Sequence, residues 1–418
     1  MEKKGYDNIK INNKTQIFLK IFLLLFIIIL ILNKKVNLLL IYSIMAIKNK
    51  YINKTIFKDL DNIKLNYKFN GINYLNKCLN KKIIIKNNDM INSPKISVII
   101  PVYNCQNSIQ ISIKSIQYQK LKEYEIILVN DYSNDKSLEI IENIKKYDKR
   151  IKIINNQKNM GTLYSRSIGS LAAKGKYIFA LDNDDIFFNE NLFENIYHIV
   201  DINDFDIVEF KSFNIPNYHP NISQIGEGYH TNHKSNLTLK QPNLGVFPIS
   251  KNKRFYPNDY FIWGKCIKSH IYKRAVNTLG FERYSKYNIW TEDISIVIII
   301  FNIAESYIFL NIYGILHLIS KSTTSYKISR NHRIISKIYL LDILIDHLKN
   351  DYQSKIYAVY LVNTIKRNEI RVLNYKQKLF FKSVLQKIIN CRYITKKNKS
   401  EIDRLNQEIT LTQTSKII

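Results

Sequence analysis

The chain has 418 residues, of which 46% are hydrophobic, so it is long and apolar enough for one large domain or two moderate ones. Lysine and arginine number 63 against 34 aspartates and glutamates, which gives a formal charge of +29. The basic residues are spread along the whole chain, together with abundant isoleucine, asparagine and tyrosine. We therefore interpret the charge as compositional bias and predict no nucleic-acid partner. The four cysteines are far apart and form no Cys-x-x-Cys pair, which argues against a zinc site and against a disulfide framework.

The first predicted element is an apolar segment near the N-terminus. A polar tail, residues 1–16, precedes the sequence IFLKIFLLLFIIILIL at 17–32. Its uninterrupted part, 21–32, is too short to cross a bilayer as a helix at about 1.5 Å per residue. The apolar residues 36–47 extend it beyond an Asn-Lys-Lys interruption. We therefore predict an uncleaved signal-anchor, a membrane-spanning segment over 17–47.

A cleaved signal peptide is the alternative interpretation of this segment. Ala46 would suit a cleavage site, whereas Ile44 fits poorly two residues before it. Lysines flank the segment on both sides, so the positive-inside rule leaves its orientation open. Residues 48–94 are polar and only weakly periodic, and we expect them to form a stem or linker.

Short apolar runs then alternate with segments of helical periodicity. This alternation predicts an α/β domain with a mainly parallel sheet and helices on both faces. The predicted strands are 96–100, 125–129, 151–154 and 177–181. Helices are predicted at 108–119 and 161–173. A further helix between them has Ser133 as its candidate N-cap and carries Leu138, Ile141 and Ile144.

Polar residues follow each predicted strand at its carboxyl end, where parallel sheets bind their ligands. After the fourth strand, Asp182-Asn183-Asp184-Asp185 places three carboxylates together. Their mutual repulsion would be relieved by a divalent cation, although an acidic surface turn is the simpler interpretation of these four residues alone. The corresponding residues after the first three strands are Tyr103-Asn104, Asn130-Asp131 and Asn159-Met160-Gly161.

The second half of the chain is less regular. Asp206–Phe210 predicts another strand, and the proline-rich segment 214–257 predicts a variable loop region. Apolar runs return over 285–325. From about residue 330 onward the pattern is helical and basic.

Five segments in order resemble the family 2 glycosyltransferases, which adopt the GT-A fold. They are Ile96–Asn104, Ile127–Ser137, Asn159–Arg166, Lys174–Tyr177 and Leu181–Asp185. The resemblance covers about 95–325 and implies a GT-A domain there, Rossmann-like with a mainly parallel sheet. The basic helical region 326–418 lies outside it, as does the N-terminal membrane anchor.

The resemblance implies a nucleotide-sugar donor, usually a UDP-sugar. Many members have a second Asp before Asp131, where this chain has Asn130. Arg166 falls where the family often has an Arg near the uracil and diphosphate, which its fork geometry suits. The nucleotide-sugar-binding residues that it implies are Pro101, Tyr103, Asn104, Asp131, Gly161, Arg166 and Asp182.

The same resemblance assigns Asp182 and Asp184 to the family's D-x-D motif. Asp184 would ligate Mn²⁺ or Mg²⁺, Asp182 would be shared between the ribose and the metal, and Asp185 would orient Asp184.

The segment Trp290-Thr291-Glu292-Asp293 resembles the family's Glu-Asp motif at a helix start, although carboxylates are also ordinary N-terminal caps. The resemblance implies Asp293 as general base and Glu292 as a residue that positions acceptor or base. Trp263 lies either on the acceptor side or in the core. His317 is expected to be a packed side chain rather than a metal ligand, and Lys321 is a candidate phosphate contact.

These residues predict a metal-dependent, inverting glycosyltransferase that moves a sugar from a nucleotide-sugar to a hydroxyl of a glycan, glycoprotein or lipid-linked acceptor. We expect a single-pass membrane protein with its catalytic domain in the ER or Golgi lumen, which the sequons at Asn53, Asn221 and Asn236 permit. The alternatives are a cytosol-facing polyprenyl-phosphate glycosyltransferase and a non-catalytic nucleotide-sugar-binding relative.

Overall fold

The structure is a computed structural model, and part of the chain is described in it. The described residues are 73, 75–78, 92–216, 226–227, 237–240, 261–285, 291–319, 329–347, 365, 370–371, 373–389 and 396–414. The predicted tail and membrane anchor lie outside these residues. Within the described part, no helix is long and apolar enough to cross a membrane.

The described strands form one mixed sheet in the order β3-β2-β1-β4-β9-β6-β10-β5, with β7 beside β6 and β8 beside β10. β3, β2, β1 and β4 are all parallel, as the sequence predicts. The strands are β1 Ile96–Val102, β2 Tyr124–Asn130, β3 Ile151–Asn155, β4 Tyr177–Ala180, β5 Ile186–Phe187, β6 Ile207–Pro216, β7 Gly226–Glu227, β8 Leu237–Lys240, β9 Lys265–Lys268 and β10 Ser306–Ile319.

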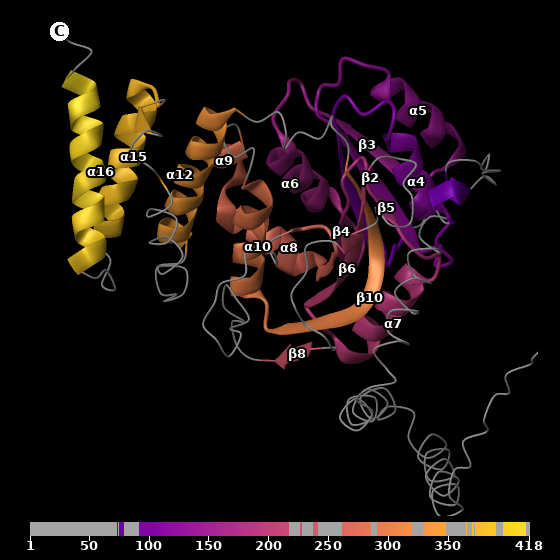
Figure 1. The fold of residues 1–418 in the computed structure, drawn as a ribbon. Helices are drawn as coiled ribbons and strands as arrows, with labels where there is room; N and C mark the ends of the chain where they lie inside the picture. Colours follow the sequence, from indigo (N-terminus) through magenta and orange to yellow (C-terminus); the bar gives the residue numbers. More distant parts are fainter. Residues whose placement is uncertain are drawn as a thin grey trace, which may run out of the picture. The chain divides into compact units, whose positions relative to one another are not determined.

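The other half of the sheet departs from the parallel pattern. β9 lies antiparallel between β4 and β6, whereas β6 and β10 are parallel to each other. β10 is a long strand whose register against β6 shifts after Leu310 and again after Tyr313, and Figure 1 shows it bending strongly around the sheet. Such irregularities let a strand change direction without leaving the sheet.

Helices cover both faces of the sheet, as predicted. Figure 1 shows α4, α5 and α7 on one face and α6, α8 and α10 on the other, followed by α12, α15 and α16 in sequence order beyond α10. The helices are α4 Ile109–Gln117, α5 Ser137–Tyr147, α6 Thr162–Ala172, α7 Leu192–Asn203, α8 Ser269–Leu279, α9 Phe281–Ser285, α10 Glu292–Ile303, α12 Arg330–His347, α15 Tyr375–Ile389 and α16 Lys396–Thr414.

The central strands are buried on both faces because helices cover both. All seven residues of β1 are buried, and this explains why its sequence is a continuous apolar run rather than an alternating one. The helix predicted to begin after Ser133 begins instead at Ser137, and Ser133 does not cap it. The Ser133 hydroxyl accepts a hydrogen bond from the Asn104 N–H at 3.2 Å.

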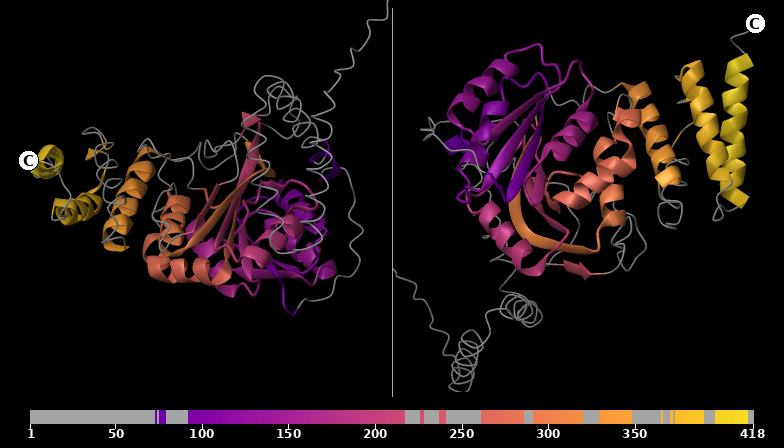
Figure 2. Two further views of the ribbon diagram at one scale, coloured as in Figure 1. Left: turned by 90° about the horizontal axis from the view of Figure 1, so that it is seen from below. Right: turned by 180° about the vertical axis from the view of Figure 1, so that it is seen from behind.

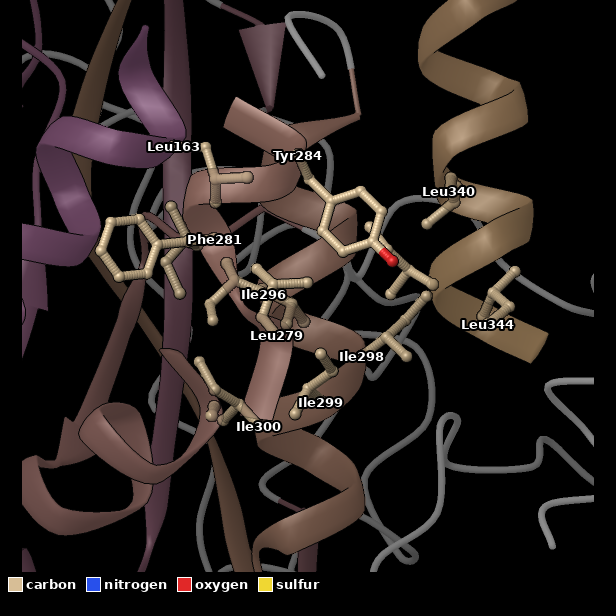
Figure 3. Packing of buried hydrophobic residues seen from close by; sticks show 14 of the residues in the cluster. Leu163, Leu279, Phe281, Tyr284, Ile296, Ile298, Ile299, Ile300, Leu340 and Leu344 are labelled. Carbon is tan, nitrogen blue, oxygen red and sulfur yellow. The ribbon is translucent and has the colours of Figure 1, made fainter. Parts of the chain in front are cut away.

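A large apolar cluster runs from the sheet through α6, α8 and α10 into α12, α15 and α16. Figure 3 shows its middle part, where Leu163 and Phe281 pack near Ile296, and Ile298 of α10 lies on the side that faces Leu344 of α12. A second cluster includes Leu75 and Cys78, which belong to the segment predicted to be a stem and are buried against residues of β5, β6 and β10.

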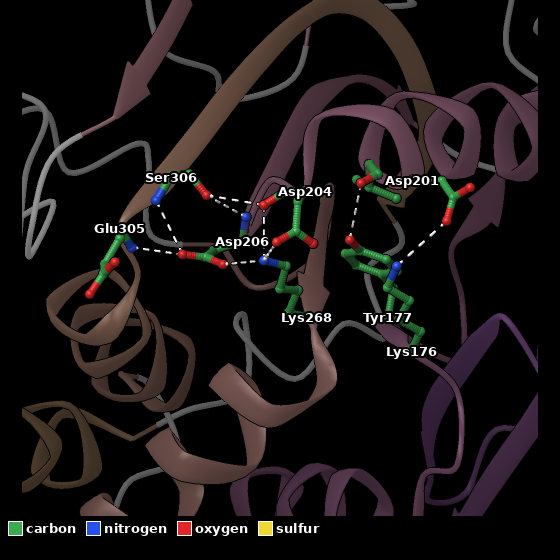
Figure 4. Close-up of polar contacts among 9 residues, drawn as sticks. Lys176, Tyr177, Asp201, Asp204, Asp206, Lys268, Glu305 and Ser306 are labelled. Carbon is green, nitrogen blue, oxygen red and sulfur yellow. Dashed lines mark hydrogen bonds and ion pairs between the residues drawn. The ribbon is translucent and has the colours of Figure 1, made fainter.

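A network of hydrogen bonds and ion pairs lies at the end of the sheet where β6 and β10 begin (Figure 4). Asp206 accepts hydrogen bonds from the backbone N–H groups of Glu305 and Ser306 at 2.8 and 3.2 Å. Lys268 Nζ lies 2.8 Å from the Asp206 carboxylate and 3.0 Å from that of Asp204. This network holds β6, β9 and β10 together at the end of the sheet opposite the carboxyl ends of the parallel strands.

Candidate active site

The carboxyl ends of β1, β2 and β3 lie side by side because these strands are parallel and in register. Val102 pairs with Asn130, which pairs with Asn155. The Asn130 side chain donates a hydrogen bond to that of Asn155 at 3.1 Å. The polar residues that follow the strands therefore gather at one rim, as the sequence predicts.

Asp131 organises the start of α6. Its carboxylate accepts hydrogen bonds from the backbone N–H groups of Met160 and Gly161, at 2.7 and 2.8 Å, and from the Asn156 side chain at 2.7 Å. Gly161 has a φ of +88°, a conformation that side chains rarely adopt, and it immediately precedes the helix. Asp131 thus holds the loop that aims the N-terminus of α6 at the rim.

The residues after β1 lie at the same rim. The Pro101 carbonyl accepts a hydrogen bond from the Asn183 side chain at 3.0 Å, which ties the first strand to the acidic turn after β4. The Asn104 side-chain oxygen accepts the Asn134 N–H at 2.8 Å. Tyr103 is 43% exposed, so part of its side chain is accessible to a ligand.

The acidic turn Asp182–Asp185 leaves β4 with its carboxylates in different surroundings. Asp185 is fully buried; its Oδ1 lies 2.9 Å from Nδ1 of His317 and accepts the Leu318 N–H at 3.2 Å. Burial, with Asp185 and Asp182 nearby, raises the pKa of Asp184 to about 7. The carboxylates of Asp182 and Asp185 therefore disfavour a negative charge on Asp184.

Arg166 of α6 joins the two acidic parts of the site. Its guanidinium, with only 5% of the side chain exposed, donates to Asp182 after β4 and to Asp293 at the start of α10. In sequence, Asp293 is 127 positions away. Desolvation opposes the charged guanidinium, yet Asp293 and Asp182 together keep the Arg166 pKa above its usual value. Asp182, predicted on the donor side, and Asp293, the predicted base, therefore share the guanidinium of Arg166.

Glu292 and Asp293 form the first turn of α10. Burial, and then the neighbouring Asp293 carboxylate, raise the pKa of Glu292 to about 8. Burial also raises the pKa of Asp293, although Arg166 opposes the shift, and 16% of the Asp293 side chain is exposed. The Ile262 N–H donates to the other Asp293 carboxylate oxygen at 3.3 Å.

Trp263 is packed rather than open. The residue is 5% exposed, and its ring stacks on those of Phe261 and His317, at 4.6 and 5.2 Å between ring centroids. Burial opposes the charge of His317, but the adjacent Asp185 raises its pKa to about 9. The predicted packing of His317 agrees with this stack. Lys321 lies outside the described residues.

The sequence did not indicate two of these contacts. The Asp185–His317 pair joins residues 132 positions apart, and the Ile262 contact to Asp293 uses a backbone N–H that carries no side-chain pattern. A long-range pairing of this kind depends on how β10 and the segment before β9 fold onto the rim.

The residues present suit a hard divalent cation. Asp182 and Asp184 offer carboxylate oxygens, and the raised pKa of Asp184 is the electrostatic condition that a cation would relieve. Across the described ranges, no group of three or more His, Cys, Asp or Glu side chains is arranged to hold a metal by itself. A cation held by Asp182 and Asp184 would complete its coordination with oxygen ligands from water or from a bound molecule.

Comparison with known proteins finds similarity to glycosyltransferases. The family model "Glycosyl transferase family 2" matches residues 97–251. An uncharacterized glycosyltransferase of Haemophilus influenzae is 43% identical over 102 residues, which are 24% of this chain and 41% of that protein. The cholesterol galactosyltransferase of Borreliella burgdorferi is 26% identical over 318 residues, covering 72% of this chain and 83% of that protein.

Among solved structures, the crystal structure of S. aureus TarS 1–349 in complex with UDP-GlcNAc matches with a TM-score of 0.50 and 13% identity, covering 76% of this chain and 89% of that one. This likeness concerns the fold. The chain spans less than half the length of the first curated relatives that it matches, at 41%, 30% and 33% of their lengths.

The mixed sheet, the rim at its carboxyl ends and these matches define a GT-A-like glycosyltransferase fold. Over residues 97–251 the chain is similar to glycosyl transferase family 2, a family of enzymes that transfer sugars.

The predicted localisation is wrong. The relatives named above, and a further one from Bacillus subtilis, are bacterial, and bacteria have neither an ER nor a Golgi lumen. The prediction rested on the apolar N-terminal segment and on the compositional bias of the chain, and neither feature distinguishes a eukaryote from a bacterium.

Proposed function

We propose that this protein is a metal-dependent, inverting glycosyltransferase that uses a nucleotide-sugar donor. The observation that carries the proposal is the Arg166 bridge between Asp182 and Asp293. It brings a carboxylate of the predicted donor site and the predicted base to opposite ends of one guanidinium. A sugar bound against this bridge would have its leaving group on the side of Asp182 and the acceptor hydroxyl on the side of Asp293.

A UDP-sugar is the first donor to test. The structural neighbour TarS was solved with UDP-GlcNAc, and the rim offers an exposed Tyr103 ring on which a base could stack. Asn104, Asp131 and Gly161 would border the nucleotide, as the family resemblance implies. Asn130 in place of a second aspartate removes one charge from this part of the site, so other nucleoside diphosphates belong in the same screen.

Asp184 and Asp182 would hold Mn²⁺ or Mg²⁺. When bound, the cation would act as a Lewis acid for the charge that develops on the diphosphate leaving group. Asp182 would then be shared between the cation and Arg166. The fully buried Asp185, fixed by His317 and the Leu318 N–H, would keep the turn in place.

Asp293 would remove the proton from the acceptor hydroxyl as the oxygen attacks the anomeric carbon. The bond to the diphosphate breaks as the new glycosidic bond forms, through an oxocarbenium-like transition state. Because a nucleoside diphosphate leaves without being protonated by an enzyme acid, one base suffices. A single displacement inverts the anomeric configuration. Glu292 would position the acceptor or the base.

The acceptor is proposed to be a hydroxyl on a glycan or on a lipid. The relative from Borreliella burgdorferi is named for galactosyl transfer to cholesterol, and its match extends over 72% of this chain. Sterol and lipid-linked alcohols are therefore tested beside oligosaccharides. A polyprenyl phosphate is the alternative acceptor, and a non-catalytic nucleotide-sugar-binding protein is the alternative function.

The decisive experiment measures nucleoside diphosphate release from a panel of UDP- and GDP-sugars with Mn²⁺, Mg²⁺ or chelator, each with and without an acceptor panel. We expect metal-dependent release that acceptor accelerates. Asp293→Asn should lower transfer by about 10²- to 10⁴-fold while the donor still binds, because the base is lost. Asp184→Asn should abolish the response to metal.

Asp201→Asn is the matched control, since Asp201 is an exposed carboxylate of α7 that pairs with Lys176 at the opposite edge of the sheet (Figure 4). It should retain wild-type turnover. Donor binding without turnover under every condition would establish the non-catalytic alternative, and equal turnover by wild type and Asp293→Asn would refute the base assignment.

A further inference from the structure

The C-terminal helices are attached to the start of α10 by specific polar contacts. Thr291, the residue immediately before Glu292, is buried, and its hydroxyl makes no capping bond to α10. The hydroxyl instead donates to the backbone carbonyl of Ser336 in α12 at 3.1 Å. Thr291, Glu292 and Asp293 are consecutive, so this bond lies two residues from the candidate base.

The other side of Thr291 is bound to α10. Its carbonyl accepts the Ser295 N–H at 3.0 Å and the Ser295 hydroxyl at 2.8 Å. Ser295 and Ser336 are both fully buried. One residue therefore links the first turn of the catalytic helix to α12, in an environment where water does not compete for the hydrogen bonds.

A second attachment lies on the far side of residues 286–290. At the end of α9, the Tyr284 hydroxyl lies 3.3 Å from the Asp342 carboxylate of α12, and Arg283 lies 3.0 Å from it. Figure 3 shows the Tyr284 ring directed toward α12. Lys387 of α15 reaches the same carboxylate at 2.6 Å. The residues before and after 286–290 are thus both held by α12.

We propose that α12 is a positioning element of the active site, and that Thr291 is the positioning residue through which it fixes Glu292 and Asp293. The inference rests on the proposed function. Residues 295–301 of α10 are all buried, so its apolar packing sets where the helix lies but distinguishes only weakly between rotations of its first turn. The Thr291–Ser336 bond is directional, and a small misplacement of a catalytic group is enough to cost a large part of the rate.

The test uses three variants of the full chain. Thr291→Val keeps the shape of the side chain and removes its donor, so we expect kcat to fall about tenfold or more with the donor KM changed less than about threefold. Thr291→Ser keeps the hydroxyl and should restore kcat to near the wild-type value. Thr410→Val removes a threonine hydroxyl that donates to the Asn406 carbonyl at an exposed position of α16, and should leave kcat unchanged.

Two further measurements separate positioning from stability and from the proposed function. Ile388→Val trims a buried side chain of α15 in the same core, and should lower the thermal midpoint without the kcat loss. Hydrogen exchange should show faster exchange of the Ser295 amide in Thr291→Val but not in Thr291→Ser. This readout needs no catalysis.

Wild-type kcat and unchanged Ser295 exchange in Thr291→Val would overturn the inference, as would a Thr291→Ser variant as impaired as Thr291→Val. An equal kcat loss in Ile388→Val would also overturn it. A wild-type protein inactive with every donor refutes the proposed function instead. In that case the exchange data alone decide whether α12 fixes the first turn of α10.

Discussion

Single residues of the site differ in how far the sequence predicts their surroundings. Asp182, Asp184 and Asp293 stand in motifs that the sequence presents directly. The partner that Asp182 and Asp293 share is not adjacent to either of them in the chain. Arg166 reaches Asp293 across 127 positions, so its role as a bridge between two carboxylates follows from the fold. Its motif implied a contact to the nucleotide, and that contact stays a prediction.

Glu292 illustrates how the tertiary structure changes the chemistry of a residue. Its pKa rises from 4.5 to about 8 through burial and the adjacent Asp293, while Arg166 opposes the shift and Asp182 adds to it. The folded state therefore binds more protons than the unfolded chain between these two values. The stability associated with protonated Glu292 is complete below about pH 4.5 and is lost as the pH rises through about 8.

Glu292→Gln should consequently flatten the pH dependence of folding. The glutamine side chain is neutral at every pH. The free energy of unfolding of the variant should therefore fall less than that of the wild type between pH 6 and 9, by about 1 kcal/mol or more. Urea titrations at a series of pH values measure this. Glu282→Gln, on the exposed side of α9, should keep the wild-type slope. An unchanged slope in Glu292→Gln would show that the carboxylate is not buried as described.

At the scale of single elements, α6 shows why local propensity is a weak guide. It carries Arg166 and packs on β1 and β2. Gly169 is a poor helix former, yet a Cβ there would lie 2.6 Å from Cγ2 of Ile99 and 3.1 Å from Cγ2 of Val129. The glycine lets the helix approach the sheet closely, which places Arg166 within reach of Asp182.

Gly169→Ala should therefore destabilise the protein. Alanine gains about 1 kcal/mol of helix propensity, but the clash costs about 1–3 kcal/mol and pushes α6 away from the sheet. We expect a lower denaturation midpoint together with reduced turnover. Leu171→Ala, at an exposed position of the same helix, should stay within about 0.5 kcal/mol of the wild type. A Gly169→Ala variant as stable as the wild type would mean that the contact relaxes without cost.

At the scale of the whole molecule, the C-terminal helices are part of the core and not an appendage. Phe381, Val384, Leu385 and Ile388 of α15 are buried in the same apolar cluster as α10 and α12, and Figure 2 shows α12, α15 and α16 side by side from two directions. The sequence predicted a helical, basic region here, and its apolar positions supply the face that packs.

A chain that ends at His347 should fail to fold cooperatively. Removing α15 and α16 uncovers apolar side chains of α12, each worth about 1.5–3 kcal/mol when buried, against a total stability of about 5–15 kcal/mol. Thermal unfolding followed by circular dichroism should show no sharp transition. A chain that ends at Thr414 keeps both helices and should unfold like the full protein. A sharp transition at the wild-type temperature in the shorter chain would contradict the shared core.

The sequence by itself determined the parallel half of the sheet, its helices and the rim on which the candidate site lies. Apolar runs such as Ile96–Ile100 specify buried strands, and alternation with helices specifies parallel pairing, because both are consequences of periodicity along the chain. The sequence also presented the carboxylates of the acidic turn and of the Glu-Asp pair, since each group lies within a few residues.

Only the tertiary structure decided how these groups meet. It inserted β9 antiparallel between β4 and β6, put Arg166 between Asp182 and Asp293, paired Asp185 with His317, and bound Thr291 to α12. These contacts join residues far apart in the chain, and no local pattern encodes their geometry. The acidic turn after β4 is thus a local property of the sequence, whereas its connection to the candidate base is a property of the folded molecule.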